Sequence, residues 1–140
     1  MDRRIGKDIH IVSNKICRKM DQFTGRFDCT HSQFTVILYL IKNKERDIFQ
    51  RDIEEEFGIR RSSVSATLSN LEEKGYIKRS SVSQDARLKK ITVTDKGEKI
   101  VEESMKIINE FEKELISQIT KEELDIFYRV LNKLASVADN

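Results

Sequence analysis

RSSVSATLSNLEEK, residues 61–74, has the spacing of an amphipathic helix. Val64, Leu68 and Leu71 recur at helical intervals, so they form one apolar stripe that can face a core. The opposite side carries side chains that are small or polar, namely Ser62, Ser65, Ala66 and Ser69. The stretch therefore predicts a helix whose outer face allows close approach to another surface.

A short helix is expected just before this stretch, in residues 50–58 (QRDIEEEFG), where Gly58 supplies the turn. Two helices joined in this way predict a helix-turn-helix, whose second helix lies in the major groove of DNA. Arg60 and Arg61 add positive charge to the helix N-terminus, which already favours a phosphate. The alternative is an ordinary helical pair with a serine-rich, solvated face. The candidate DNA contacts on this helix are Arg60, Arg61, Ser62, Ser63, Ser65, Ala66 and Ser69.

A β-hairpin is expected after the second helix. Residues 76–82 (YIKRSSV) and 88–94 (LKKITVT) read as strands, and residues 83–87 (SQDAR) read as the turn between them. A slim hairpin beside a helix-turn-helix is a wing, which can place one arginine in a minor groove. The fold class predicted is therefore mainly α, with a winged helix-turn-helix.

Four charged residues of this hairpin are candidates for DNA contact. Arg87 is the candidate for the minor groove, and Asp85 is expected to hold its guanidinium by a charge-assisted hydrogen bond. Lys89 and Lys90 are expected near phosphates. The alternative is a surface salt bridge on a soluble turn, which contributes little.

Positive charge is concentrated in this part of the chain. The whole sequence of 140 residues has a net charge of +2. Residues 60–90 contain eight basic and three acidic residues, a balance of +5, so the remainder is about −3 by subtraction. This separation is typical of a polyanion-binding surface. The basic residues of this window are Arg60, Arg61, Lys74, Lys78, Arg79, Arg87, Lys89 and Lys90.

Long helices are expected on both sides of the winged helix. Apolar residues recur at helical spacing in residues 4–24 and 95–119, and Thr30 opens a capping box for a helix ending near Asn43. Thr120 opens a second capping box, for a last helix. The residues of that helix expected to be buried are Leu124, Phe127, Leu131 and Leu134. These apolar faces exceed what one small domain can cover, which predicts a homodimer.

SSVSATLSNLEEKGYIKR followed by DARLKKITVTDKG resembles the recognition helix and wing of the MarR family of winged helix-turn-helix transcription regulators. The hallmark is the run from Asp85-x-Arg87 to Thr94-x-x-Gly97, behind a Leu-Glu-x-x-Gly junction that begins at Leu71. The resemblance covers nearly the whole chain in outline. It implies one domain, residues 1–140, with a DNA-binding lobe at about 30–94 and dimerisation helices at about 4–24 and 95–138.

The resemblance also implies a function. Members bind pseudo-palindromic operator DNA as homodimers, and small anionic or phenolic ligands or thiol oxidation often relieve that binding. A pocket for a small aromatic or anionic effector is accordingly expected near Phe34, Ile37 and Ile108. The sequence departs from the family where Arg60 and Arg61 replace the usual polar cap. Capping is therefore expected to fall to Ser62.

Other functional classes have less support in the sequence. An enzyme would need a catalytic constellation, and the chain has two histidines and no Gly-rich phosphate loop, so neither an enzyme nor a cofactor is expected. Cys17 and Cys29 are expected to be free thiols, with thiol-based sensing or a zinc site of Cys29, His10 and His31 as alternatives. A winged helix that binds proteins instead of DNA is the remaining alternative. The N-terminus lacks an apolar signal segment, so a cytoplasmic location is expected.

Overall fold

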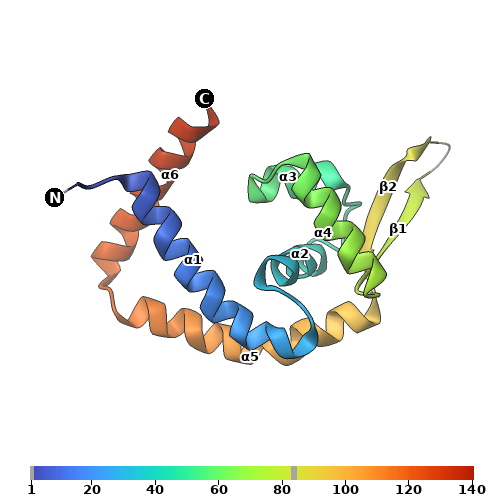
Figure 1. Ribbon diagram of the computed structural model, residues 1–140, viewed down its shortest axis with the longest axis horizontal. Helices are drawn as coiled ribbons and strands as arrows, with labels where there is room; N and C mark the ends of the chain where they lie inside the picture. The colour runs from blue at the N-terminus through green and yellow to red at the C-terminus, as the bar shows by residue number, and fades with distance from the viewer. Residues whose placement is uncertain (1, 83–84) are drawn as a thin grey trace. The chain divides into compact units, whose positions relative to one another are not determined.

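The computed structural model describes residues 2–82 and 85–140 (Figure 1). Its structured segments, in chain order, are α1 (Ile5–Thr24), the short 3-10 helix η1 (Gly25–Phe27), α2 (His31–Lys42), α3 (Gln50–Phe57), α4 (Arg61–Glu73), β1 (Ile77–Val82), β2 (Asp85–Val93), α5 (Asp95–Ser117) and α6 (Lys121–Asp139). The prediction of a mainly helical winged-helix fold is confirmed. The chain forms two compact units, Met1–Met105 and Lys106–Asn140, and the boundary between them falls within α5.

The caps predicted for α2 and α6 are both present. The Thr30 side chain accepts a hydrogen bond from the Gln33 backbone N–H, and the Gln33 side chain accepts one from the Thr30 backbone N–H. Thr120 and Glu123 form the same reciprocal pair at the start of α6. Each box satisfies two backbone donors that a helix start leaves unpaired, which explains why both helices begin where the sequence predicts.

The turn between α3 and α4 depends on Gly58. This residue ends α3 with φ +60°, a left-handed conformation that costs glycine little. The N-cap of α4 is Arg60, whose carbonyl accepts from the Val64 N–H without a side-chain cap. The prediction that Ser62 would cap this helix is wrong, because extended backbone at Arg60 starts the helix and the side chain of a cap residue is not required for that.

α4 packs through its predicted apolar stripe. Val64, Leu68 and Leu71 are buried, and α4 lies against α3 and β1. Ile53 of α3 and Phe34 of α2 are also buried in this core. Full burial of a large aliphatic or aromatic side chain contributes about 1.5–3 kcal/mol. The core thus fixes which side of α4 faces away from the protein.

β1 and β2 form the antiparallel hairpin that follows α4 (Figure 1). The pairing runs from Ile77 opposite Val93 to Ser81 opposite Lys89, and shifts between Ser81 and Val82. Ile48 adds one bridge to β2, where its carbonyl accepts from the Ile91 N–H at 2.8 Å. The hairpin is thereby tied at its base to the segment that precedes α3.

The predicted boundaries of the hairpin need a correction. Asp85 and Arg87 were expected in the turn, but they belong to β2, because Val82 pairs with Asp85 and extends the ladder. The part of the turn predicted at Ser83 and Gln84 lies outside the described residues. The Asp-x-Arg pair therefore sits on extended backbone, where side chains two residues apart share a face.

The Thr94-x-x-Gly97 motif closes the base of the hairpin. Thr94 Oγ1 donates to the Gly75 carbonyl at 2.6 Å and accepts from the Gly97 N–H at 3.2 Å. A Cβ at Gly97 would lie 2.4 Å from the Tyr76 carbonyl oxygen, so only glycine fits without a shift. This motif joins the start of α5 to the junction between α4 and β1.

The apolar face of α6, in the second unit, is not buried as predicted. Leu124, Phe127, Leu131 and Leu134 were expected to be buried, but α6 has no buried residue, and Phe127 is 53% exposed. Helical periodicity identifies an apolar face, but it does not identify what covers that face. No described helix is long and apolar enough to cross a membrane. The exposed apolar residues of α5, α6 and the turn between them include Ile116, Ile119, Ile126, Phe127, Tyr128, Val130 and Val137.

Candidate nucleic-acid interface

The outer face of α4 carries most of the predicted contact residues. Ser62, Ser63, Ala66 and Ser69 are exposed, as are Arg60 and Arg61 at its start. Ser65 differs from its neighbours because it is half-buried and accepts a hydrogen bond from Gln50 Nε2 at 2.8 Å. The helix therefore presents small polar groups outward, but the hydroxyl of Ser65 already has a partner within the protein.

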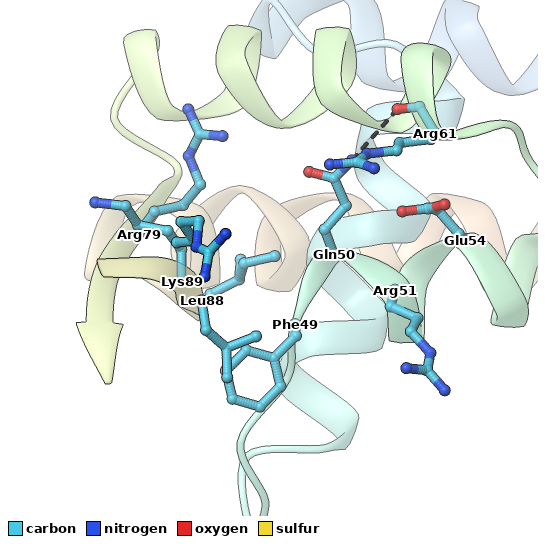
Figure 2. A pocket seen from close by; sticks show the side chains of 10 residues that line it. Phe49, Gln50, Arg51, Glu54, Arg61, Arg79, Leu88 and Lys89 are labelled. Carbon is cyan, nitrogen blue, oxygen red and sulfur yellow. Dashed lines mark hydrogen bonds between the residues drawn. The ribbon is translucent and has the colours of Figure 1, made fainter. Parts of the chain in front are cut away.

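A pocket of about 410 Å³ lies between this helix-turn-helix and the hairpin, and we call it the cationic pocket. Figure 2 shows Arg79 and Lys89 on one side, and Gln50, Glu54 and Arg61 on the other. Its apolar lining comes from Phe49, Leu88 and Ile91. The cations that line it are Arg51, Arg61, Arg79, Arg87 and Lys89.

The cations of this pocket differ in how they are held. Arg79 donates from Nη2 to Glu72 Oε1 at 3.0 Å, and this hydrogen bond lowers the pKa of the Glu72 carboxyl below its ordinary value. Arg51 pairs with Glu55 at 3.4 Å on α3, and both side chains are mostly exposed. Arg61 has no ion pair among residues 2–82 and 85–140. With a single carboxylate in its lining, at Glu54, the pocket suits an anion.

Arg87 is almost fully exposed, with 97% of its side chain accessible. The Asp85 carboxylate lies 3.8 Å from Arg87 Nε, which is an ion pair but too long for the predicted hydrogen bond. The Asp85 carboxylate instead accepts a hydrogen bond from the backbone N–H of Arg87, at 3.0 Å. Asp85 therefore stabilises the backbone of β2, and it does not hold the Arg87 guanidinium by a hydrogen bond.

Lys89 and Lys90 have different surroundings, because successive residues of a strand face opposite sides. Lys89 lines the cationic pocket, and its Nζ lies 3.5 Å from Ser81 Oγ. Lys90 pairs with Asp47 at 3.3 Å and lines a separate pocket with it. The two lysines were predicted to act alike, but only Lys89 lies on the side of Arg61 and Arg79.

The residues predicted to line an effector pocket are buried. Phe34 and Ile37 are 1% and 0% exposed in the core of the first unit, and Ile108 is 6% exposed in the second. The effector pocket stays a prediction.

The cysteines differ in exposure. Cys29 is 3% exposed, and burial raises the pKa of its thiol to about 11, so it is protonated at neutral pH. Cys17 is half-buried, and both thiols are free. In the described part of the chain, no three His, Cys, Asp or Glu side chains are grouped so that they could hold a metal ion. This finding gives no support to the zinc alternative built on Cys29, His10 and His31.

Sequence reasoning missed several residues of this site. Gln50 and Arg51 were predicted only as part of a short helix, and Arg79 only as a basic residue of the first strand. Leu88 and Phe49 were given no role, although both line the pocket. The pairing of Arg79 opposite Ile91 could have been inferred from hairpin register, but the approach of Gln50 to α4 depends on tertiary packing.

Comparison with known proteins gives one consistent result. The sequence profile described as the MarR family matches residues 27–88. The chain is similar to MepR of Staphylococcus aureus, seen in a crystal structure of a MepR–DNA complex, with 31% identity, a TM-score of 0.91, and coverage of 98% of this chain and 99% of that one. The transcription regulator MarR from Oenococcus oeni PSU-1 is 28% identical, with a TM-score of 0.79 over 95% of this chain and 99% of that one.

A curated relative agrees with these structures. The HTH-type transcriptional regulator PapX of Escherichia coli is 28% identical over 123 residues, which are 88% of this chain and 75% of PapX.

Proposed function

The chain belongs to the MarR family of transcription regulators, and we propose that it acts as a homodimeric repressor that binds pseudo-palindromic operator DNA through α4 and the wing. The observation that carries this proposal is the cationic pocket, which brings Arg61 of α4 and Arg87 of β2 to one surface. A relative with 31% identity, MepR, has been crystallised with DNA, which supports the same partner here.

We assign the major groove to α4. Ser62, Ser63, Ala66 and Ser69 are small and exposed, so the helix axis can come close to base edges, which serine hydroxyls can contact. Arg60 and Arg61 stand at the helix N-terminus, where backbone N–H groups and the helix dipole also favour a phosphate. This arrangement supports base reading by the serines and anchoring by the arginines.

We assign the wing to the adjacent minor groove. Arg87 is free enough to enter a narrow A·T-rich groove, where the negative potential is strongest. We assign Lys89, which lines the cationic pocket together with Arg79, to the phosphates between the two grooves. Lys90 is a weaker candidate, because its ammonium already faces Asp47.

The homodimer is supported by apolar surface that one chain leaves uncovered. Ile5, Ile9 and Val12 of α1 are 60%, 44% and 53% exposed, and α6 exposes Phe127 and Tyr128 as well. Exposed apolar surface of this extent is typical of an interaction site. Sedimentation should give twice the mass of the chain, and a concentration-independent monomer at micromolar protein would contradict the dimer.

A small aromatic or anionic effector is the proposed signal for release. Any such ligand must bind the DNA-incompetent arrangement more tightly than the DNA-bound one. Because Phe34 and Ile37 are fully packed, a ligand near them would have to displace core side chains and thereby disturb α2. Salicylate at millimolar levels is the probe, and unchanged melting temperature and unchanged DNA affinity would remove the aromatic-effector proposal.

The test of the DNA-binding proposal is selection of fragments of the source genome by the purified protein, followed by a mobility shift at several salt concentrations. We expect a small set of related, partly palindromic sequences, whose affinity falls steeply with salt. Selection of no sequence, with binding that does not depend on salt, would favour the alternative of a protein-binding winged helix.

A further inference from the structure

The side chain of Gln50 extends from α3 to the start of α4. Its Nε2 donates to Ser65 Oγ at 2.8 Å and to the Arg61 carbonyl at 3.3 Å, and Figure 2 shows the bond to Arg61 as a dashed line. Gln50 is the first residue of α3, while Arg61 and Ser65 lie one turn apart in α4. One amide group therefore holds the first turn of α4 at two points.

These hydrogen bonds restrict the rotation of α4 about its axis, which apolar packing alone does not fix. Val64 and Leu68 bury one stripe of α4, but apolar contacts are non-directional and tolerate small rotations of the helix about its axis. A hydrogen bond requires a distance and an angle, so the contact to Ser65 selects one rotation. The direction in which the exposed serines point then depends on Gln50.

The other end of α4 has a matching contact. Gln33 Nε2 donates to Asn70 Oδ1 at 2.7 Å, while Gln33 Oε1 accepts from the Thr30 N–H in the capping box of α2. Lys74, the C-cap of α4, donates to the Asp28 carbonyl at 2.6 Å. Side chains from α3 and α2 thus hold α4 near its two ends.

We propose that Gln50 is a positioning residue for sequence recognition, and that Ser65 contributes to recognition through Gln50 instead of through a base. Ser65 is half-buried and its hydroxyl oxygen accepts a hydrogen bond from Gln50 Nε2, whereas Ser62, Ser63, Ala66 and Ser69 are exposed. The inference rests on the proposed DNA-binding function, and it removes Ser65 from the base-reading set assigned by sequence reasoning.

A double-mutant cycle tests the proposal. The variants are Gln50→Met, which keeps the length of the side chain without its amide, Ser65→Ala, and both together. The probes are duplexes that the wild-type protein selects from a random-sequence library, compared with unselected duplexes. Each single variant loses the hydrogen bond between Gln50 and Ser65, so its preference for selected duplexes should fall by up to about tenfold. The double variant should lose no more than Gln50→Met alone, which already removes the bonds to Ser65 and to the Arg61 carbonyl.

Arg87→Ala is the matched control. Arg87 lies on β2 and not on the helix that Gln50 orients, so the effect of Arg87→Ala should be the same in the wild-type and Gln50→Met backgrounds. Repeating the selection with Gln50→Met and with Ser65→Ala should yield the same altered sequence profile for both, a readout that loss of stability alone would not produce. Melting temperatures measured on the same samples should stay close to that of the wild type.

Two contrary outcomes can be told apart. Additive losses for Gln50→Met and Ser65→Ala, or a change of preference at one base position for Ser65→Ala alone, would make Ser65 a base reader and overturn this inference only. A wild-type protein that selects no sequence would overturn the proposed function, and this inference with it.

Discussion

The recognition helix α4 and the wing strand β2 provide the two halves of one surface, but the protein holds them differently. Leu68 and Leu71 of α4 are fully buried, and side chains from α3 and α2 reach Ser65 and Asn70 near its two ends. Arg87 of β2 is 97% exposed, and its ion pair is with Asp85 of the same strand. Exposed ion pairs contribute little to order.

This difference separates two tasks. A helix that is already oriented loses little freedom on binding, so its contacts can discriminate between bases. An exposed arginine must be ordered when DNA binds, but it can adapt to grooves of different width. We therefore expect changes in α4 to affect stability or sequence preference, and changes in the wing to affect affinity without affecting stability.

The largest effect is expected from Leu68→Ala. Leu68 is fully buried, so its truncation leaves a cavity and should lower the free energy of unfolding by about 2–5 kcal/mol. Ser69→Ala, on the exposed face one residue away, should change it by less than about 0.5 kcal/mol. Denaturant unfolding measures both. Similar losses for the two variants would mean that α4 is not held by its apolar stripe.

Arg87→Ala should have the next largest effect, on binding alone. Loss of a minor-groove arginine should cost about 1–3 kcal/mol in affinity for selected duplexes and weaken any A·T preference beside the half-sites. The melting temperature should be unchanged, because the side chain is almost fully exposed. Wild-type affinity across salt concentrations would show that the wing is only a soluble hairpin.

Lys89 and Lys90 are neighbours on the wing, but we expect them to contribute differently to DNA binding. Lys89→Ala should reduce the slope of log affinity against log salt by about one, since one phosphate contact is lost. Lys90→Ala should reduce it less, because Lys90 faces Asp47 on the other side of the strand. Titration of binding with salt measures both slopes, and equal reductions would contradict the assignment of Lys89 to the cationic pocket.

The smallest effect expected near neutral pH concerns Cys29. Its folded pKa of about 11 exceeds the ordinary value of 9.0, so folding favours the protonated thiol. The corresponding stability is fully present below about pH 9 and is lost as the pH rises toward 11. Unfolding of the wild type and of Cys29→Ala between pH 7 and pH 11 should show a steeper loss for the wild type. Parallel curves would show that the thiol does not titrate in this way.

The parts of the fold that the sequence predicted correctly depend on residues that are close to one another in the chain. The Thr30 and Thr120 capping boxes and the turn at Gly58 depend on residues close in sequence, and all were predicted correctly. Helical periodicity likewise identified Leu68 and Leu71 as core residues. These features need no knowledge of distant neighbours.

The predictions that were wrong or missing concern contacts between residues that are far apart in the sequence. The burial predicted for Phe127 failed because an apolar stripe does not say whether the same chain covers it. The contact of Gln50 with Ser65 and the pairing of Lys90 with Asp47 join separate elements, so only the packed structure reveals them. The excess of positive charge in residues 60–90 was predicted, but the pocket was not, because which cations share it depends on how the hairpin lies against α3 and α4.

DNA binding by a surface made of α4 and the wing is tested by removing two positive charges from that surface and, in a separate variant, two from elsewhere. Arg61→Ala with Arg87→Ala changes one residue in α4 and one in the wing, while Lys99→Ala with Lys113→Ala removes equal charge from exposed positions of α5. Binding of selected duplexes is measured against salt for both pairs and for the wild type. We expect a slope lower by about two for the arginine pair and an unchanged slope for the lysine pair. Equal losses for the two pairs would show that net charge, not a surface made by α4 and the wing, binds the DNA.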